Sequence, residues 1–340
     1  MADPSTGAAP IQKSTNVRKS GSAWVPIFRL LGRVAPRLAA AAADRMFFTP
    51  PPPRRSRGNA MLRRGRSFRV PAEGGHVAGW RWGRGPAVVL LHGWGGHSGQ
   101  LTSFVAPLLS RGLSVVALDA PGHGRSSRGL SSAVQFARAL RAVVDATGPV
   151  HGVVAHSLGG CAVALAARDG LPVSRVVLIA SPVNPPAWVE VFAARFGLTP
   201  EVVDLVKSRS ERRLGFRWDD LRVPALAAGL RQPLLVIHDR HDAEVPLSDG
   251  ASIAAAWPGG RLVETAGLGH HRVLRDPAVI AEAVDFLAAD APPAACAGGE
   301  QAKGACADHL EQSLYDREAR WDEWRSRPKP VAGAGGLSLS

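Results

Sequence analysis

Cysteine is scarce in this sequence, with only Cys161, Cys296 and Cys306 among 340 residues. Three cysteines cannot build a disulfide framework, and so low a number suits a reducing compartment. We therefore expect a cytoplasmic protein. The hydrophobic fraction of 46% is sufficient for a large core, in one α/β domain or in two smaller ones.

Acidic residues are nearly absent from the first 70 residues, which hold 14 Lys or Arg and only 2 Asp or Glu. The rest of the chain holds 27 and 26, so residues 1–70 carry +12 of the net charge of +13, and we assign this charge to a basic leader over 1–66. No helix-turn-helix, zinc-finger or aromatic-platform pattern accompanies this charge. We therefore do not expect nucleic-acid binding. For the leader, we favour a solvated tail over contact with an anionic membrane surface.

Uninterrupted apolar runs of membrane-spanning length are also missing. Residues 146–167 contain no Asp, Glu, Lys or Arg, but His151, His156 and Ser157 interrupt the run. We interpret this segment as a strand, a sharp turn and a helix rather than as a span.

An amphipathic helix is predicted over residues 23–48 of the leader. Arg29, Arg33 and Arg37 recur there at four-residue spacing, which places all three on one face of a helix. We expect this helix to dock on the globular domain. Peripheral contact with a membrane surface is the alternative. We rank it below docking, because two prolines and an alanine-rich stretch make a weak lipid anchor.

From residue 67 to residue 290, short β-rich runs alternate with longer helical stretches, an order typical of a doubly wound α/β domain. The predicted strands are 67–70, 77–82, 87–91, 114–119, 150–155, 175–180, 233–238 and 261–265. Several of them are continuous apolar runs, which indicates strands covered on both faces. The sequence therefore predicts a mostly parallel eight-stranded sheet flanked by helices.

Two segments depart from this alternation. Residues 182–231 contain no strand pattern and are predicted to form a short helical lid over one edge of the sheet. The C-terminal extension, 291–340, has a different composition. We expect a helix over 307–326, with its apolar side packed on the domain, and disorder over 331–340.

Ser157 is the candidate nucleophile, because the run 153–160 reads as an apolar strand that turns sharply through a serine into a helix. Such an elbow needs small residues two positions before and after the serine. Ala155, Gly159 and Gly160 meet this need, although Ala155 departs from the strict glycine pattern.

A serine hydroxyl needs a general base and an acid that orients the base. Asp242 follows the seventh predicted strand, and His270 follows the last one in a glycine-rich loop. We rank Asp242 above the neighbouring acids Asp239 and Glu244, and we rank His270 above His271. The order of serine, acid and histidine along the chain fits this assignment.

Backbone donors for an oxyanion are predicted at Leu158, directly after the nucleophile, and at Trp94 in the glycine-rich loop 92–97. The side chains of Trp94 and His156 are the predicted substrate-binding groups.

Taken together, these motifs resemble those of the α/β-hydrolase fold superfamily. The resemblance rests on 92–95, 119–126, 155–160, Asp242 with Val245 and Pro246, and Gly269 with His270. It implies a catalytic triad, an oxyanion hole and no cofactor, and a structural turn without a catalytic role at 119–126. Serine at position 157 argues against the haloalkane dehalogenase and epoxide hydrolase branches, whose nucleophile is a carboxylate.

Metal and dinucleotide sites are not expected. His238, His241 and Asp242 do not form a convincing ligand set, and neither do Cys306 and His309 with Cys296. The glycines at 93–96 match a dinucleotide fingerprint only crudely.

The sequence therefore predicts a serine hydrolase that cleaves a small-molecule carboxylic ester or thioester through an acyl-serine intermediate. An acyltransferase, an amidase or a carbon–carbon hydrolase on the same triad is the first alternative. A catalytically idle scaffold that binds at a membrane surface is the second. The oligomeric state is left open.

Overall fold

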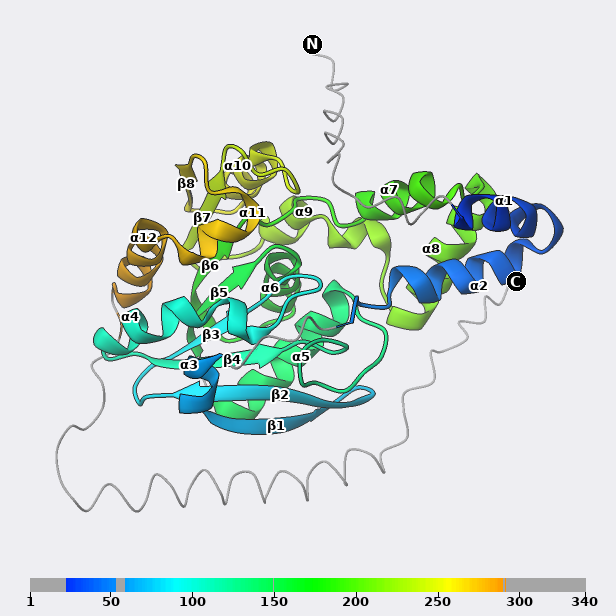
Figure 1. Ribbon diagram of the computed structural model, residues 1–340. Helices are drawn as coiled ribbons and strands as arrows, with labels where there is room; N and C mark the ends of the chain where they lie inside the picture. Colours follow the sequence, from blue (N-terminus) through cyan, green and yellow to red (C-terminus); the bar gives the residue numbers. More distant parts are fainter. Residues whose placement is uncertain (1–22, 53–58, 149, 290, 292–340) are drawn as a thin grey trace, which may run out of the picture. The chain divides into compact units, whose positions relative to one another are not determined.

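An eight-stranded sheet forms the centre of the computed structural model, which describes residues 23–52, 59–148, 150–289 and 291 (Figure 1). The strands are β1 (Arg66–Ala72), β2 (Gly75–Trp82), β3 (Ala87–Leu91), β4 (Ser114–Asp119), β5 (Val150–His156), β6 (Val173–Ile179), β7 (Leu234–Asp239) and β8 (Gly260–Thr265). Their order is β1-β2-β4-β3-β5-β6-β7-β8. Strands β3 to β8 run parallel, whereas β1 and β2 pair antiparallel. The predicted mostly parallel eight-stranded sheet is confirmed.

Helices cover both faces of this sheet and create two apolar cores. Along β3, Val89 and Leu91 belong to one core, whereas Val88 and Leu90 belong to the other, as the two-residue period of a strand requires. The first core is completed by α5 (Ala133–Thr147), α6 (Leu158–Arg168), α9 (Val223–Ala227) and α10 (Leu247–Ala256). The second is completed by α3 (Ala60–Arg64), α4 (Val105–Ser110), the 3-10 turns η3 (Thr102–Phe104) and η5 (Val273–Arg275), and α12 (Pro277–Ala288).

The segment between β6 and β7 is helical, in the range where a lid is predicted. It contains α7 (Ala187–Phe196), α8 (Pro200–Leu214), the 3-10 turn η4 (Trp218–Leu221) and α9. Thr199 caps α8 by accepting a hydrogen bond from the backbone N–H of Val202, and Pro200 occupies the first turn.

The N-terminal segment corrects one expectation, because it forms two helices rather than one. They are α1 (Trp24–Val34) and α2 (Pro36–Phe47). Ala35 lies between them with φ −151° and ψ 67°, outside the helical region. A residue that precedes proline avoids helical backbone angles, so Pro36 ends the first helix and begins the second.

The two N-terminal helices dock on the helices inserted between β6 and β7. Helix α2 packs along α8, and α1 contacts α7. A small apolar cluster lies between them, formed by Phe28, Ala39, Ala40, Ala43, Val202 and Val206. Asp44 is buried beside it and forms ion pairs with Arg213 at 3.0 Å and with Arg209 at 3.6 Å. We call α1, α2, α7 and α8 the cap.

The predicted helix at 307–326 and the predicted tail at 331–340 lie outside the described residues. Within the described ranges, no helix has the length and apolarity needed to cross a membrane.

Candidate active site

Ser157 lies in the tight turn between β5 and α6, at the carboxyl end of the parallel strands. Its φ of 51° and ψ of −125° fall in a region that residues other than glycine rarely adopt. The backbone N–H of Ser157 donates to the carbonyl of Ile179 at 2.9 Å, which ties the turn to β6. Strain of this kind persists only where the surroundings over-determine the backbone, and it concentrates at functional sites.

The small residues after Ser157 are required by close backbone approach. A Cβ atom at Gly159 would lie 2.7 Å from the carbonyl oxygen of His92 and 3.0 Å from that of Leu91. At Gly160 it would lie 2.0 Å from the Ser181 hydroxyl. The spacing predicted from the sequence therefore has a direct steric cause.

Asp242 and His270 are hydrogen-bonded to each other, with 2.7 Å between Asp242 Oδ2 and His270 Nδ1. The other carboxylate oxygen of Asp242 accepts the backbone N–H groups of Glu244 and Val245, at 2.8 and 2.9 Å. Burial of the carboxylate raises its pKa, but the hydrogen bond and charge of His270 and these two backbone donors lower it below its ordinary value. Asp242 is therefore an anchored carboxylate that orients His270.

The competing acids and the second histidine have other partners. Asp239 accepts hydrogen bonds from the backbone N–H of His241 and Leu268 and from the Thr265 hydroxyl. It joins the loop that follows β7 to the loop that follows β8. Glu244 pairs with the exposed His271 at 3.1 Å, and that hydrogen bond lowers the pKa of Glu244.

His270 also lies close to the elbow. It is the second residue of the short helix α11 (Gly269–Arg272) after β8, and its ring centroid is 4.7 Å from that of His156, the residue before Ser157. In the described chain no hydrogen bond joins Ser157 to His270, whose Nε2 lies 3.9 Å from a Glu244 carboxylate oxygen. Catalytic hydrogen bonds are often long in the absence of substrate and shorten when it binds.

The loop after β3 reaches the nucleophile turn through Gly93. A Cβ atom there would lie 2.7 Å from the Cβ of Ser157, so only glycine permits this approach. The next residue is Trp94, whose side chain is partly exposed. Leu158 is the first residue of α6, and the first N–H groups of a helix have no partner within it. Leu158 thus directly follows Ser157, and Trp94 directly follows the glycine that lies against it.

The loop that carries Trp94 is held by two buried histidines. His92 accepts the backbone N–H of Ala120 at its Nε2, and its Nδ1 lies 2.7 Å from the carbonyl of Gly93. His123 accepts the backbone N–H of Gly95 at 3.0 Å. Burial lowers the pKa of each histidine to about 4, so both rings are neutral at pH 7 and can accept these bonds.

A family model described as "alpha/beta hydrolase fold" matches residues 86–223, and a second, described as "TAP-like protein", matches residues 219–298. The chain belongs to the α/β-hydrolase fold superfamily.

Two curated relatives of this α/β hydrolase are matched over part of their length. A serine hydrolase-like protein from Danio rerio is 39% identical over 107 residues, which cover 29% of this chain and 32% of the relative. A pimeloyl-(acyl-carrier protein) methyl ester esterase from Methylococcus capsulatus is 39% identical over 111 residues, covering 31% of this chain and 42% of that protein. The match therefore spans less than half of each relative.

A solved structure, that of Est1E from Butyrivibrio proteoclasticus with bound ferulic acid, shares the fold. Its TM-score is 0.52 at 18% sequence identity, and the match covers 65% of this chain and 99% of that structure. At this identity the likeness shows the shared α/β-hydrolase fold alone.

His156 does not have the environment of a substrate-binding side chain. It is buried, burial lowers its pKa to about 3, and its Nε2 lies 2.9 Å from the carbonyl of His270. A neutral ring in this position donates a hydrogen bond to that carbonyl and thereby holds the loop that carries His270. This geometry favours a positioning role over the predicted contact with substrate.

Sequence reasoning missed three polar contacts of the α/β-hydrolase site. His123 was assigned only to a structural turn, yet it accepts the backbone N–H of Gly95 in the loop after β3. His238 is fully buried, donates to the carbonyl of Val245 at 3.0 Å and lies 3.7 Å from Asp242. The pair of Glu244 and His271 borders His270. The signal was the position of each residue at a strand end, but only the folded loops show which groups meet.

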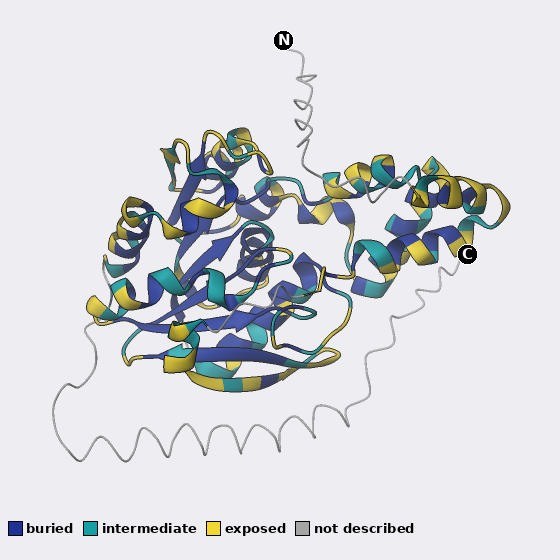
Figure 2. Cartoon of the chain, in the orientation of Figure 1, coloured by how far each residue is buried: buried dark blue, intermediate teal, exposed yellow. Residues whose placement is uncertain are grey.

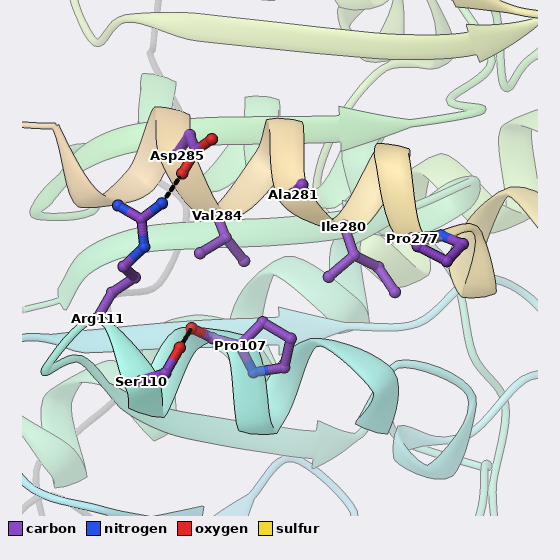
Figure 3. A pocket seen from close by; sticks show the side chains of 8 residues that line it. All are labelled: Pro107, Ser110, Arg111, Pro277, Ile280, Ala281, Val284 and Asp285. Atoms are coloured by element: carbon purple, nitrogen blue, oxygen red, sulfur yellow. Dashed lines mark hydrogen bonds and ion pairs between the residues drawn. The ribbon is translucent and has the colours of Figure 1, made fainter.

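A groove elsewhere on this α/β hydrolase contains none of these residues (Figure 3). It lies between α4 and α12, has a volume of about 340 Å³, and is bordered by the ion pair of Arg111 with Asp285. Among the described residues, no three His, Cys, Asp or Glu side chains are placed to hold a metal ion.

Proposed function

We propose that this protein is a serine hydrolase that cleaves a carboxylic ester or thioester through an acyl-serine intermediate. The observation that carries the proposal is the 2.7 Å hydrogen bond between Asp242 and His270, beside the strained turn of Ser157. The pattern of nucleophile, base and orienting acid is the one that activates a serine hydroxyl.

The relatives support ester cleavage. One is described as a methyl ester esterase and another as a serine hydrolase-like protein, each 39% identical over the matched segment. The matched segments cover only part of those proteins. We therefore do not assign the substrate of either relative to this chain.

In the acylation step, Ser157 Oγ attacks the substrate carbonyl carbon while His270 Nε2 accepts the hydroxyl proton. Asp242 holds the other ring nitrogen protonated and stabilises the imidazolium that forms. The backbone N–H groups of Leu158 and Trp94 donate to the oxyanion. When the tetrahedral intermediate collapses, His270 returns the proton to the departing alcohol or thiol.

In the deacylation step, water takes the place of the leaving group. His270 accepts a proton from the water as its oxygen attacks the acyl carbon, and it then returns that proton to Ser157. The acid product leaves and the enzyme is restored.

Labelling with a fluorophosphonate probe tests the nucleophile. The wild-type chain is expected to be labelled, and Ser157→Ala is expected to abolish labelling. His270→Ala should slow p-nitrophenyl ester hydrolysis by about 10²-fold or more, because the general base is lost. His271→Ala is the matched control, since this neighbouring side chain is mostly exposed and pairs with Glu244. Equal labelling of wild type and Ser157→Ala would overturn the proposal.

A panel of esters of increasing acyl length, assayed with water alone and with added alcohol, would define the substrate. Acid as the main product supports hydrolysis, whereas a new ester as the main product would assign an acyltransferase. The cap is the segment that we expect to set acyl length, because it contains the helices inserted between β6 and β7.

A further inference from the structure

The outer side of α1 carries a stripe of exposed apolar side chains. In the part of the chain that the structure describes, eight large apolar residues are exposed, and five of them lie between positions 24 and 38. Their exposed fractions are 47% for Trp24, 51% for Ile27, 64% for Leu30, 70% for Val34 and 66% for Leu38. Figure 2 shows the exposed residues of this helix.

The helical spacing places these side chains on one face. Intervals of three and four residues keep Trp24, Ile27, Leu30 and Val34 within one side of α1, and Leu38 is a further exposed apolar side chain near the start of α2. The opposite side of α1 is already used, because Phe28 and Gly32 are buried against the cap. The stripe is therefore a second apolar face, separate from the one that holds the cap together.

A contiguous apolar face on the surface of a folded protein is typical of an interaction site. The neighbouring helix α7 contacts α1 and carries two more exposed apolar side chains, Trp188 and Val191. These seven residues include two of the tryptophans that favour the boundary between water and lipid.

The charge beside the stripe is positive. Arg29, Arg33 and Arg37 are exposed along the same two helices. Asp44 is the sole acidic residue in 23–52, and it is buried against Arg213. On α7, Glu190 is paired with Lys207 at 2.5 Å. The surface beside the apolar stripe thus presents arginines without a neighbouring free carboxylate in the N-terminal helices.

We infer that this face docks on the surface of an anionic lipid bilayer. Exposed apolar side chains gain free energy by leaving water for the acyl boundary, and arginines are attracted to anionic headgroups. The helices would lie in the plane of the membrane surface, since none in the described chain can span it. A second copy of the chain fits less well, because a two-fold contact would bring the same arginines against each other.

Flotation of the full-length protein with vesicles tests this inference. One set of vesicles contains phosphatidylcholine alone, and the other contains about a third phosphatidylglycerol. We expect binding to the anionic vesicles that weakens as salt is added. Ser157→Ala must bind equally well, so the result does not depend on the proposed hydrolase function.

Two sets of variants with matched controls locate the face. The combined Ile27→Ser, Leu30→Ser and Val34→Ser variant is expected to lower the partition coefficient about tenfold or more, because the buried apolar area is lost. The combination of Ile27→Leu, Leu30→Ile and Val34→Ile preserves the apolar face and should bind as wild type does. Circular dichroism checks that each variant is folded.

The charge is tested in the same way. Replacing Arg29, Arg33 and Arg37 by Gln should lower anionic-vesicle binding about tenfold or more. Replacing the exposed Arg84, Arg128 and Arg231 by Gln removes the same charge elsewhere and should change binding little.

Several outcomes would overturn the inference. They are no binding of wild type to anionic vesicles, equal loss in both arginine variants, or unchanged binding of the combined Ile27→Ser, Leu30→Ser and Val34→Ser variant. Light scattering covers the case in which wild type does not bind vesicles. If wild type is then a dimer and the combined variant with serine at positions 27, 30 and 34 is a monomer, the face is assigned to self-association instead.

Discussion

At the scale of single residues, the site depends on polar groups whose partners determine their protonation. Asp242 is kept ionised by His270 and two backbone donors. His92, His123 and His156 are kept neutral by burial. Each neutral ring can therefore accept a hydrogen bond from a backbone group of the loops around Ser157, or donate one to it.

Asp242→Asn is expected to reduce kcat by about 10³-fold or more, because an amide in this position favours the wrong tautomer of His270 and cannot stabilise its imidazolium. Glu244→Gln is the comparison, since Glu244 is half-exposed and lies 3.9 Å from the histidine. Its kcat should fall less than about tenfold. Steady-state hydrolysis of a p-nitrophenyl ester measures both, and equal losses would contradict the assignment of the acid.

At the scale of elements, the turn from β5 to α6 and the loop after β3 form one steric unit. Gly93 lies against Ser157, and Gly159 lies against the carbonyls of Leu91 and His92. The chain after α2 extends this unit, because Pro51 lies against Gly95 and Pro50 against Gly122. The N-terminal helices are thus continuous with a segment that lies against the loops after β3 and β4.

Gly159→Ala should destabilise the protein by about 2 kcal/mol or more, because the new methyl group meets backbone oxygens that cannot move aside. At Gly229 a Cβ atom would have no neighbour within 4 Å. Gly229→Ala should therefore change the free energy of unfolding by less than about 0.5 kcal/mol. Urea denaturation measures both, and a tolerated alanine at 159 would refute the steric argument.

At the scale of the whole molecule, apolar cores on both faces of the sheet enclose the ionisable groups that support the site. The three buried histidines have folded pKa values of about 4, 4 and 3, below the ordinary value of 6.5. Below pH 6.5 the unfolded chain takes up protons that the folded chain does not. The stabilising effect of these neutral rings is complete above pH 6.5 and is lost as the pH falls towards their folded values.

The free energy of unfolding should therefore fall between about pH 6.5 and pH 4, with each histidine contributing about 2 kcal/mol of loss by pH 5. His123→Gln should reduce the slope of stability against pH by about one proton over this range. Urea denaturation at a series of pH values gives the slope separately from any general loss of stability. A stability that is constant from pH 6.5 to pH 4.5 would contradict the burial of these rings as neutral groups.

Strand positions and the order of the motifs followed from local pattern alone. All eight predicted strands overlap the observed ones, because apolar runs bounded by glycine and proline signal a covered strand directly. The helical character of 182–231 was predicted because this segment contains no strand pattern. The break at Ala35 was missed because three evenly spaced arginines indicated a single helix, whereas the restriction that Pro36 places on its predecessor was decisive.

The sequence by itself determined the α/β-hydrolase fold, the serine in its turn, and the order of acid and histidine after it. Tertiary structure decided which groups meet: Asp242 with His270, His123 with the loop after β3, His156 with the carbonyl of His270, and the N-terminal helices with α7 and α8. The physical reason is that strand and helix patterns reflect neighbours along the chain. Hydrogen-bond partners and exposed faces depend instead on how loops distant in sequence pack together.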